Sequence, residues 1–186
     1  MRFRFWIIIA AALFAAGIWA GLAVHQADPS ILASLFSEQA SALGSIGSWL
    51  GEFGVLTLIF IYLKNAIALV VSFMLSPILC LVPVLALVFN SALISYVGAA
   101  VVQEKSLGYL LAGVLPHGIF ELPALIIGEA AALSFGVAAM ISLFSRGRGD
   151  YLRESFRRDF RYLVVALVLL VPAAIIETFV TPIFIT

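Results

Sequence analysis

Three residues in this sequence have the chemistry to hold a cation together: one histidine and two glutamates. His117 and Glu121 are four residues apart, so a helix would place both side chains on one face. Glu177 lies in the last apolar segment of the chain. One imidazole and two carboxylates can bind a divalent metal ion. The spacing alone does not decide for a metal, because the sequence has no His-Glu-x-x-His motif and no second clustered histidine.

A second group of polar residues interrupts apolar stretches elsewhere in the chain: Lys64, Asn65, Asn90 and Glu129. Ionisable side chains within such stretches are costly and are functional by default. One interpretation is a buried polar core, in which Lys64 pairs with Glu129 and the asparagines bond across helices. The other is a path for protons or ions. No Ser-His-Asp arrangement, phosphate-binding loop or nucleotide fingerprint is present, so no catalytic or cofactor-binding residue is predicted.

The composition shows what kind of protein must position these side chains. Of the 186 residues, 64% are hydrophobic and 11% are charged, and the mean hydropathy is +1.20. A soluble domain carries about 25% charged residues, so this class of protein is excluded. The formal net charge is zero, which gives no reason to expect a nucleic-acid partner. The single cysteine, Cys80, excludes an intrachain disulfide and is expected to be a small buried side chain.

Hydropathy predicts five membrane spans, at about 5–24, 55–75, 78–101, 117–144 and 162–182. Each is close to or above the ~20 residues needed to cross the hydrocarbon. The spans must be helical, because lipid cannot satisfy an open backbone and no alternating segments indicate a barrel. The first run is long for a signal-peptide core, so we expect a retained helix. We therefore predict an all-α integral membrane protein, a single membrane domain of residues 1–186 built as a bundle of five transmembrane helices.

The placement of basic residues predicts the orientation of this bundle. Arg2 and Arg4 precede the first span, and six arginines lie in the connection between the fourth and fifth spans. The 25–54 connection contains no lysine or arginine. Lysine and arginine concentrate on the cytoplasmic side, and five spans place both basic segments on one side. We expect a multipass protein of the cell membrane with its N-terminus in the cytoplasm and its C-terminus outside.

Two connections have the character of interfacial segments. Residues 29–52 carry apolar side chains at roughly helical spacing, and Asp28 and Pro29 suit a helix start. We expect an amphipathic helix on the outer face, which either lies on lipid or serves as a docking surface or lid. Residues 107–115 are apolar but too short to span, and are expected to form an interfacial or re-entrant piece that leads into Pro116.

The cytoplasmic loop 145–161 is rich in arginine. A helical arrangement would place Arg153, Arg157 and Arg161 on one stripe, and these side chains could sit on anionic lipid headgroups. The alternative is that the positive charge only sets the topology. Acidic residues within the same loop argue against nucleic acid. The expected partners are therefore the lipid bilayer and, at Arg146 to Arg161, anionic headgroups.

The segment that contains the histidine resembles a known signature. Residues 115–124 read Leu-Pro-His-Gly-Ile-Phe-Glu-Leu-Pro-Ala and resemble the stage II sporulation protein M family, with Pro116, His117, Gly118, Glu121 and Pro123 as the motif residues. The resemblance extends over about residues 60–186. It includes the asparagines Asn65 and Asn90 in two earlier spans and the Glu-Thr-Phe-Val-Thr-Pro segment that begins at Glu177.

This resemblance implies a role in assembly rather than in catalysis. The founding protein is a membrane component of the complex that remodels septal peptidoglycan during engulfment, and it anchors wall-cleaving partners. We therefore expect a non-enzymatic scaffold or assembly factor that binds membrane or envelope proteins or forms a homo-oligomer. One alternative is a component of an ion- or proton-coupled transporter or channel that uses the buried Glu, Lys and His residues. The other is an intramembrane metalloenzyme with a divalent metal at His117, Glu121 and Glu177.

Overall fold

The computed structural model describes residues 2–27, 54–144 and 149–185, and all regular structure in these ranges is helical. The helices are α1 (Phe3–Ala27), α3 (Val55–Leu75), α4 (Leu81–Glu104), α5 (Leu107–Phe144), α6 (Gly149–Phe179) and α7 (Thr181–Ile185). Five of them are long and apolar enough to cross a membrane. The predicted all-α membrane fold is confirmed. The predicted amphipathic helix at 29–52 lies outside the described residues.

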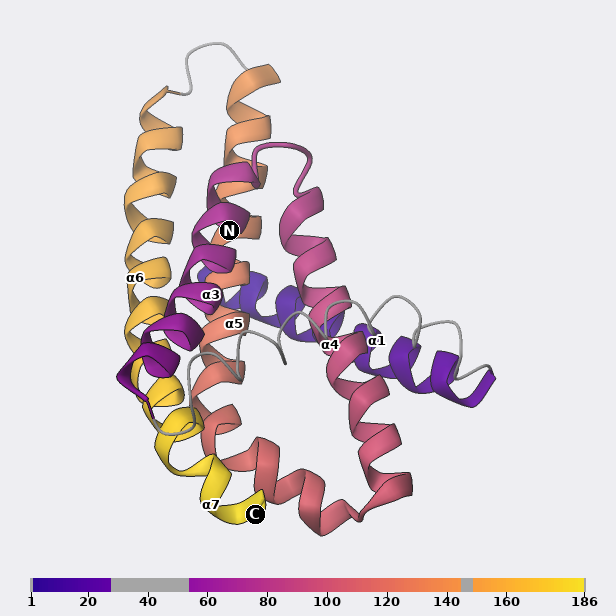
Figure 1. Cartoon of the computed structure of the whole chain (residues 1–186). Helices are drawn as coiled ribbons and strands as arrows, with labels where there is room; N and C mark the ends of the chain where they lie inside the picture. The colour runs from indigo at the N-terminus through magenta and orange to yellow at the C-terminus, as the bar shows by residue number, and fades with distance from the viewer. Residues whose placement is uncertain (1, 28–53, 145–148, 186) are drawn as a thin grey trace.

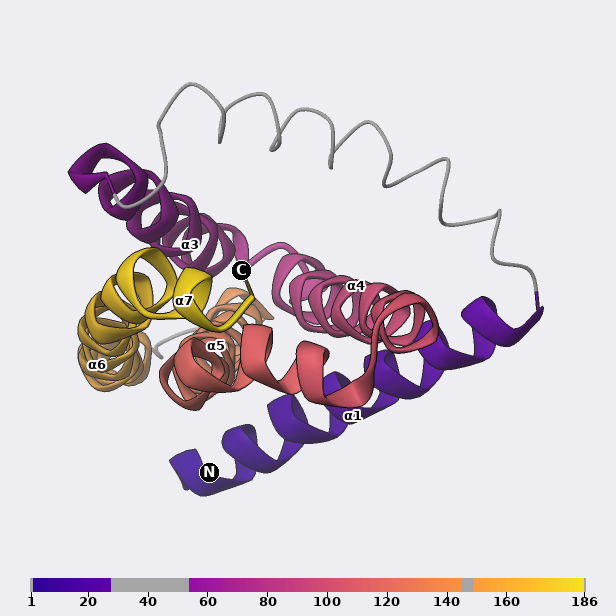
Figure 2. The same cartoon turned by 60° about the horizontal axis from the view of Figure 1, so that its bottom comes forward.

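The bundle is built around α5, which contacts each of the other described helices. Figure 2 shows α5 in the middle, with α6 and α3 on one side and α4 and α1 on the other. The buried middle of α5 is made of small residues, among them Gly128, Ala130, Ala131, Ala132, Ser134 and Gly136. Small side chains allow helices to approach closely where lipid offers no hydrophobic driving force between them. This sequence therefore explains why α5 occupies the centre.

Helix α5 bends near the end of the bundle where the chain also terminates. Figure 1 shows its first part crossing this end before the helix turns to run along α6. Pro116 and Pro123 lie within the helix, and each lacks the backbone N–H that would complete a helical hydrogen bond. The sequence places 107–115 in a separate piece, but the structure makes these residues the start of α5. The 38-residue helix is about 57 Å long by helical rise, well beyond one membrane thickness.

Helix α6 also begins earlier than predicted. Residues 149–161, expected as part of a loop, form its first turns and continue into the apolar span without a break. The basic segment is thus helical wherever the structure describes it. A continuous helix is favoured here because it satisfies the backbone of the segment without any other partner.

Helix α1 is held against α4 by two glycines one helical turn apart. Figure 1 shows α1 running across the other long helices, and its main contacts are with α4 and α5. A Cβ on Gly17 would lie 2.6 Å from the Val88 carbonyl oxygen, and one on Gly21 would lie 2.8 Å from the Ala92 Cα. Glycine is required at both positions because α4 backbone occupies the space of a side chain. This GxxxG pair is a known helix-packing motif.

A short turn of residues 76–80 joins α3 to α4 and packs against α5. Leu79 and Cys80 both adopt a left-handed backbone with φ of 54°. Cys80 is buried, as predicted, and its Sγ lies 3.7 Å from the Leu133 carbonyl oxygen of α5. A Cβ on Gly136 would lie 2.5 Å from the Ser76 carbonyl oxygen, so glycine lets α5 reach the turn.

Candidate functional site

The structure brings together the histidine and the two glutamates that the sequence singles out. His117 and Glu121 lie on α5 just after the start of its bend, and Glu177 lies near the end of α6. Each residue offers one ligand atom, and these atoms all lie within 4.8 Å of one another. The convergence expected from helix periodicity and from the antiparallel run of α5 and α6 is therefore present. We call these three residues the His/Glu cluster.

The imidazole of His117 is fixed from both sides. Its Nδ1 lies 3.3 Å from the hydroxyl oxygen of Thr181, which belongs to the short helix α7. Its Nε2 lies 3.7 Å from Oε2 of Glu121. The side chains of His117 and Glu121 are 15% and 30% exposed, so the cluster lies at the edge of the bundle and not in its centre. The sequence analysis did not identify Thr181 as a member of this site.

Two residues of α3 extend the cluster. The Asn65 amide donates a hydrogen bond of 3.0 Å to Oε1 of Glu121. The charge of Lys64 acts on the Glu177 carboxylate, as does that of Glu121. In the described residues no carboxylate lies within 4.0 Å of the Lys64 ammonium group. Asn65 and Lys64 therefore belong with the His/Glu cluster and not with a separate central layer.

The predicted pair of Lys64 and Glu129 is wrong. Glu129 is 1% exposed, and its Oε2 accepts a hydrogen bond of 2.5 Å from Ser72. Its Oε1 has no hydrogen-bond partner in the described part of the chain. Lys64 is exposed on α3 and forms no ion pair with Glu129. The prediction placed the two residues at a similar depth, but Glu129 lies level with Ser72, which is about 12 Å along α3 from Lys64 by helical rise. Asn65, next to Lys64, contacts Glu121 instead.

Asn90 is also placed differently from the prediction. The sequence analysis includes it in a buried polar core, but its side chain is exposed on α4. It makes no hydrogen bond to any residue that the structure describes. By helical rise, Asn90 lies about 15 Å from the 76–80 turn and Lys64 lies about 18 Å from it. Two exposed polar groups thus occupy similar depths on neighbouring spans.

An ion pair between a half-buried arginine and a buried aspartate near the other end of α6 was not predicted. Asp159 is fully buried and accepts hydrogen bonds of 2.8 and 3.1 Å from Nε and Nη2 of Arg158. Arg158 Nη2 also donates a bond of 2.7 Å to Ser134 of α5. This network ties the basic segment to the bundle. An acidic residue beside an arginine was the available signal, but the acidic residues of this loop were used only to argue against a nucleic-acid partner.

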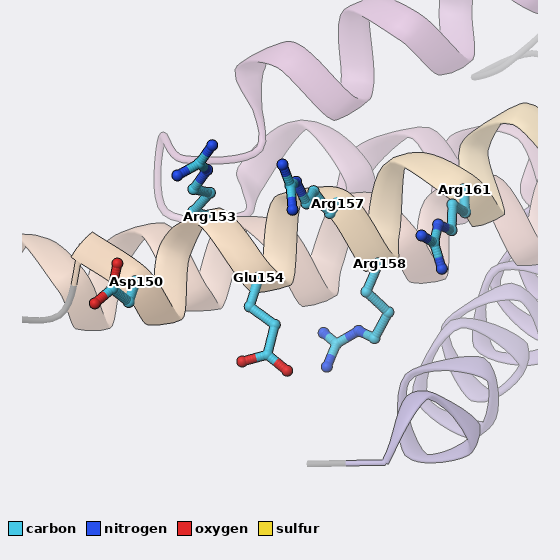
Figure 3. Close-up of a pocket in the computed structure, with 6 residues that line it drawn as sticks. All are labelled: Asp150, Arg153, Glu154, Arg157, Arg158 and Arg161. Carbon is cyan, nitrogen blue, oxygen red and sulfur yellow. The ribbon is translucent and has the colours of Figure 1, made fainter.

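The other arginines that the structure describes in this segment remain outside the network, while Arg146 and Arg148 lie outside the described residues. Arg153, Arg157 and Arg161 are exposed, and Figure 3 shows Arg153 and Arg157 extending from a different side of α6 than Arg158. A guanidinium group in such a position is free to meet lipid phosphate or water. The stripe predicted from helical spacing is therefore present in the structure, while its ligand stays a prediction.

Comparison with known proteins identifies the family of this chain. A family model described as Stage II sporulation protein M matches residues 10–182. The chain belongs to this family. An uncharacterised protein of Methanocaldococcus jannaschii is similar, with 27% identity over 97 residues, which are 52% of this chain and 54% of that protein. The match thus spans about half the length of this curated relative. No solved structure matches the chain.

The His/Glu cluster is built largely from the family's signature segment. The signature segment at 115–124 forms the bend of α5, and it supplies two of the three cluster residues. Pro116, which precedes His117, lies within the helix and accounts for a bend at this position. In this member of the stage II sporulation protein M family, the signature therefore positions a polar site at the end of a membrane bundle.

Proposed function

We propose that this protein is a non-enzymatic membrane scaffold or assembly factor that binds the transmembrane helix of a partner protein. Family membership supports the general role. The observation that carries the proposal is the exposure of Lys64 and Asn90 on α3 and α4. A charged or amide side chain facing lipid is costly, and polar side chains hold membrane helices together through hydrogen bonds. A partner helix that covers Lys64 and Asn90 removes the cost of exposing each of them to lipid.

The chemistry of the surface defines the partner. Lys64 carries a positive charge and Asn90 offers both a donor and an acceptor. The apolar residues beside Lys64 on α3 are exposed as well, for example Leu63 at 46% and Ile67 at 57%. We therefore expect a transmembrane helix that is mostly apolar and carries a carboxylate or an amide group at the depth of Lys64.

Photo-crosslinking in intact membranes tests this proposal. A photoreactive amino acid at Ile67 should form an adduct with another membrane protein, because Ile67 lies one helical turn from Lys64 on the same exposed face. The adduct should be lost when Lys64→Met removes the charge. Mass spectrometry of the adduct identifies the partner, and the partner's sequence should contain the expected polar residue in a span.

Matched controls separate specific binding from general disruption. Lys105→Met removes a lysine from the exposed end of α4 and should keep the adduct. The same photoreactive residue at Val168, exposed at 63% on α6, should react with lipid. Adducts at Ile67 that contain only lipid, or only a second copy of this chain, would contradict the proposal.

We also propose that the protein lies in the cell membrane with its N-terminus in the cytoplasm and its C-terminus outside. The support is the concentration of arginine at the start of α1 and at the start of α6. In this orientation Arg153, Arg157 and Arg161 face the cytoplasmic leaflet, where they would bind anionic headgroups at about 1 kcal/mol each. The His/Glu cluster then lies toward the outer side.

Single cysteines test this orientation. With Cys80→Ser as the background, Ser106→Cys should react with an impermeant thiol reagent added to whole cells, because it follows α4 on the outer side. Asp150→Cys at the start of α6 should react only after the membrane is opened. Both residues are exposed in the structure. The reverse pattern of labelling would overturn the proposed orientation.

A further inference from the structure

We propose that His117, Glu121 and Glu177 form a binding site for one divalent transition-metal ion, of which zinc is the best fit. Its ligands include neither Lys64 nor Asn90, whose exposure carries the proposed function, so this inference goes beyond that function. The three ligand atoms come from two helices and lie within 4.8 Å of one another. Histidine nitrogen and carboxylate oxygen are both common ligands of zinc and of other first-row transition-metal ions.

A chain of hydrogen bonds sets the histidine in the form that binds a metal. The Thr181 hydroxyl donates to the Ile176 carbonyl oxygen at 3.3 Å, so its hydrogen is already used. The same oxygen lies 3.3 Å from His117 Nδ1 and must therefore accept the hydrogen from that nitrogen. Nε2 is then left with its lone pair, directed toward Glu121. Metal-binding histidines commonly have this arrangement, with the second ring nitrogen donating to a fixed acceptor.

The two glutamate carboxylates are also oriented for binding a metal ion. The Asn65 amide occupies Oε1 of Glu121 at 3.0 Å, which leaves Oε2 facing His117 Nε2 at 3.7 Å. Two atoms that both carry lone pairs thus face each other, and Glu177 brings a second carboxylate to the same place. The Glu177 carboxylate accepts no hydrogen bond from the described residues. A cation at the centre turns this repulsive arrangement into an attractive one.

The dimensions suit a small ion. Ligand bonds of about 2.0–2.2 Å to a tetrahedral zinc ion separate the ligand atoms by about 3.3–3.6 Å. The His117–Glu121 separation of 3.7 Å is close to this range, and small side-chain rotations would bring Glu177 into it. Three protein ligands leave a further position for water. The partial exposure of His117 and Glu121 gives the ion a way in.

Zinc titration of the full-length protein in detergent tests the inference. After chelator treatment and dialysis, the protein should bind one zinc ion per chain in competition with a chromophoric chelator. Glu177→Gln and His117→Ala should each weaken binding by more than about 100-fold. Thr181→Val should weaken it by about 10- to 100-fold, as expected for a residue that orients a ligand. Glu104→Gln, an exposed glutamate of α4, should leave the affinity unchanged.

A second measurement uses the wild-type protein, so the proposal can be tested even if the variants do not fold. Cobalt(II) added to the wild-type chain should give visible absorption bands of a low-symmetry nitrogen and oxygen site, and zinc should displace them. Zinc binding that is unchanged in both ligand variants would overturn the proposal. So would a wild-type protein that binds no zinc and shows no cobalt bands, which would mean that a proton on Nε2 holds His117 and Glu121 together.

Discussion

Replacing Gly21 by leucine should separate α1 from α4 and lower the melting temperature by about 2–12 °C. The Cβ of any larger residue would meet the Ala92 carbonyl oxygen and the Ser95 hydroxyl, and would lie 2.8 Å from the Ala92 Cα. Backbone cannot rotate away as a side chain can, so α1 itself has to move. Overpacking of this kind costs about 1–3 kcal/mol, and each kcal/mol lowers the melting temperature by about 2–4 °C at this chain length.

The natural cysteine gives a direct readout for this experiment. Cys80 is buried and is the sole cysteine of the sequence, so its reaction with a fluorescent maleimide during heating reports unfolding. Ala16→Leu is the matched control, because Ala16 is exposed on the opposite face of α1 and should tolerate the larger side chain. If both variants melt at the wild-type temperature, the close α1–α4 contact does not hold the bundle together.

The GxxxG pair could have been identified from the sequence, but the prediction did not include it. Hydropathy alone does not report such packing motifs. Hydropathy located all five long helices, because length and apolar content are enough to identify a span. It does not tell which spans touch. Gly17 and Gly21 carry that information, since two small residues one turn apart allow backbone to meet backbone. The crosswise packing of α1 on α4 depends on these two positions.

Helix periodicity and estimated membrane depth predicted some contacts of the polar residues but not others. His117 and Glu121 could be placed on one face because a helix repeats every 3.6 residues, and Glu177 could be added because sequential helices are neighbours. The partner of Glu129 could not be found in the same way. Counting residues within each span placed Lys64 level with Glu129, but Glu129 bonds to Ser72, two turns later on α3, and Asn65 beside Lys64 bonds to Glu121. The shift of one helix along another depends on packing that one sequence does not reveal.

The contact of Thr181 with His117 could not be predicted, for a different reason. The last predicted span ran to residue 182, which would make Thr181 part of a straight helix. In the structure α6 ends at Phe179 and α7 begins at Thr181, and the change of direction carries the threonine to His117. A break between two helices is set by a few local backbone angles, and boundaries are the least certain part of any sequence-based assignment.

Glu129→Ala should cost the protein at least about 2 kcal/mol of stability. The side chain is 1% exposed, so its loss leaves a cavity between α3 and α5 and removes the acceptor of the Ser72 hydroxyl. Maleimide labelling of Cys80 again gives the melting temperature. Glu104→Ala removes an exposed glutamate from α4 and should change it little.

Glu129→Gln separates the scaffold from a proton-coupled transporter. Glutamine keeps the volume and an oxygen that can accept from Ser72, so this variant should fold and keep the Lys64-dependent adduct at Ile67. The unpartnered Oε1 of Glu129 favours transport, because a carboxyl group with a free oxygen can exchange a proton. Proteoliposomes with an internal pH dye decide the question. We expect equal, background proton flux for wild type and Glu129→Gln, whereas a wild-type flux that disappears in the folded variant would replace the scaffold with a transporter.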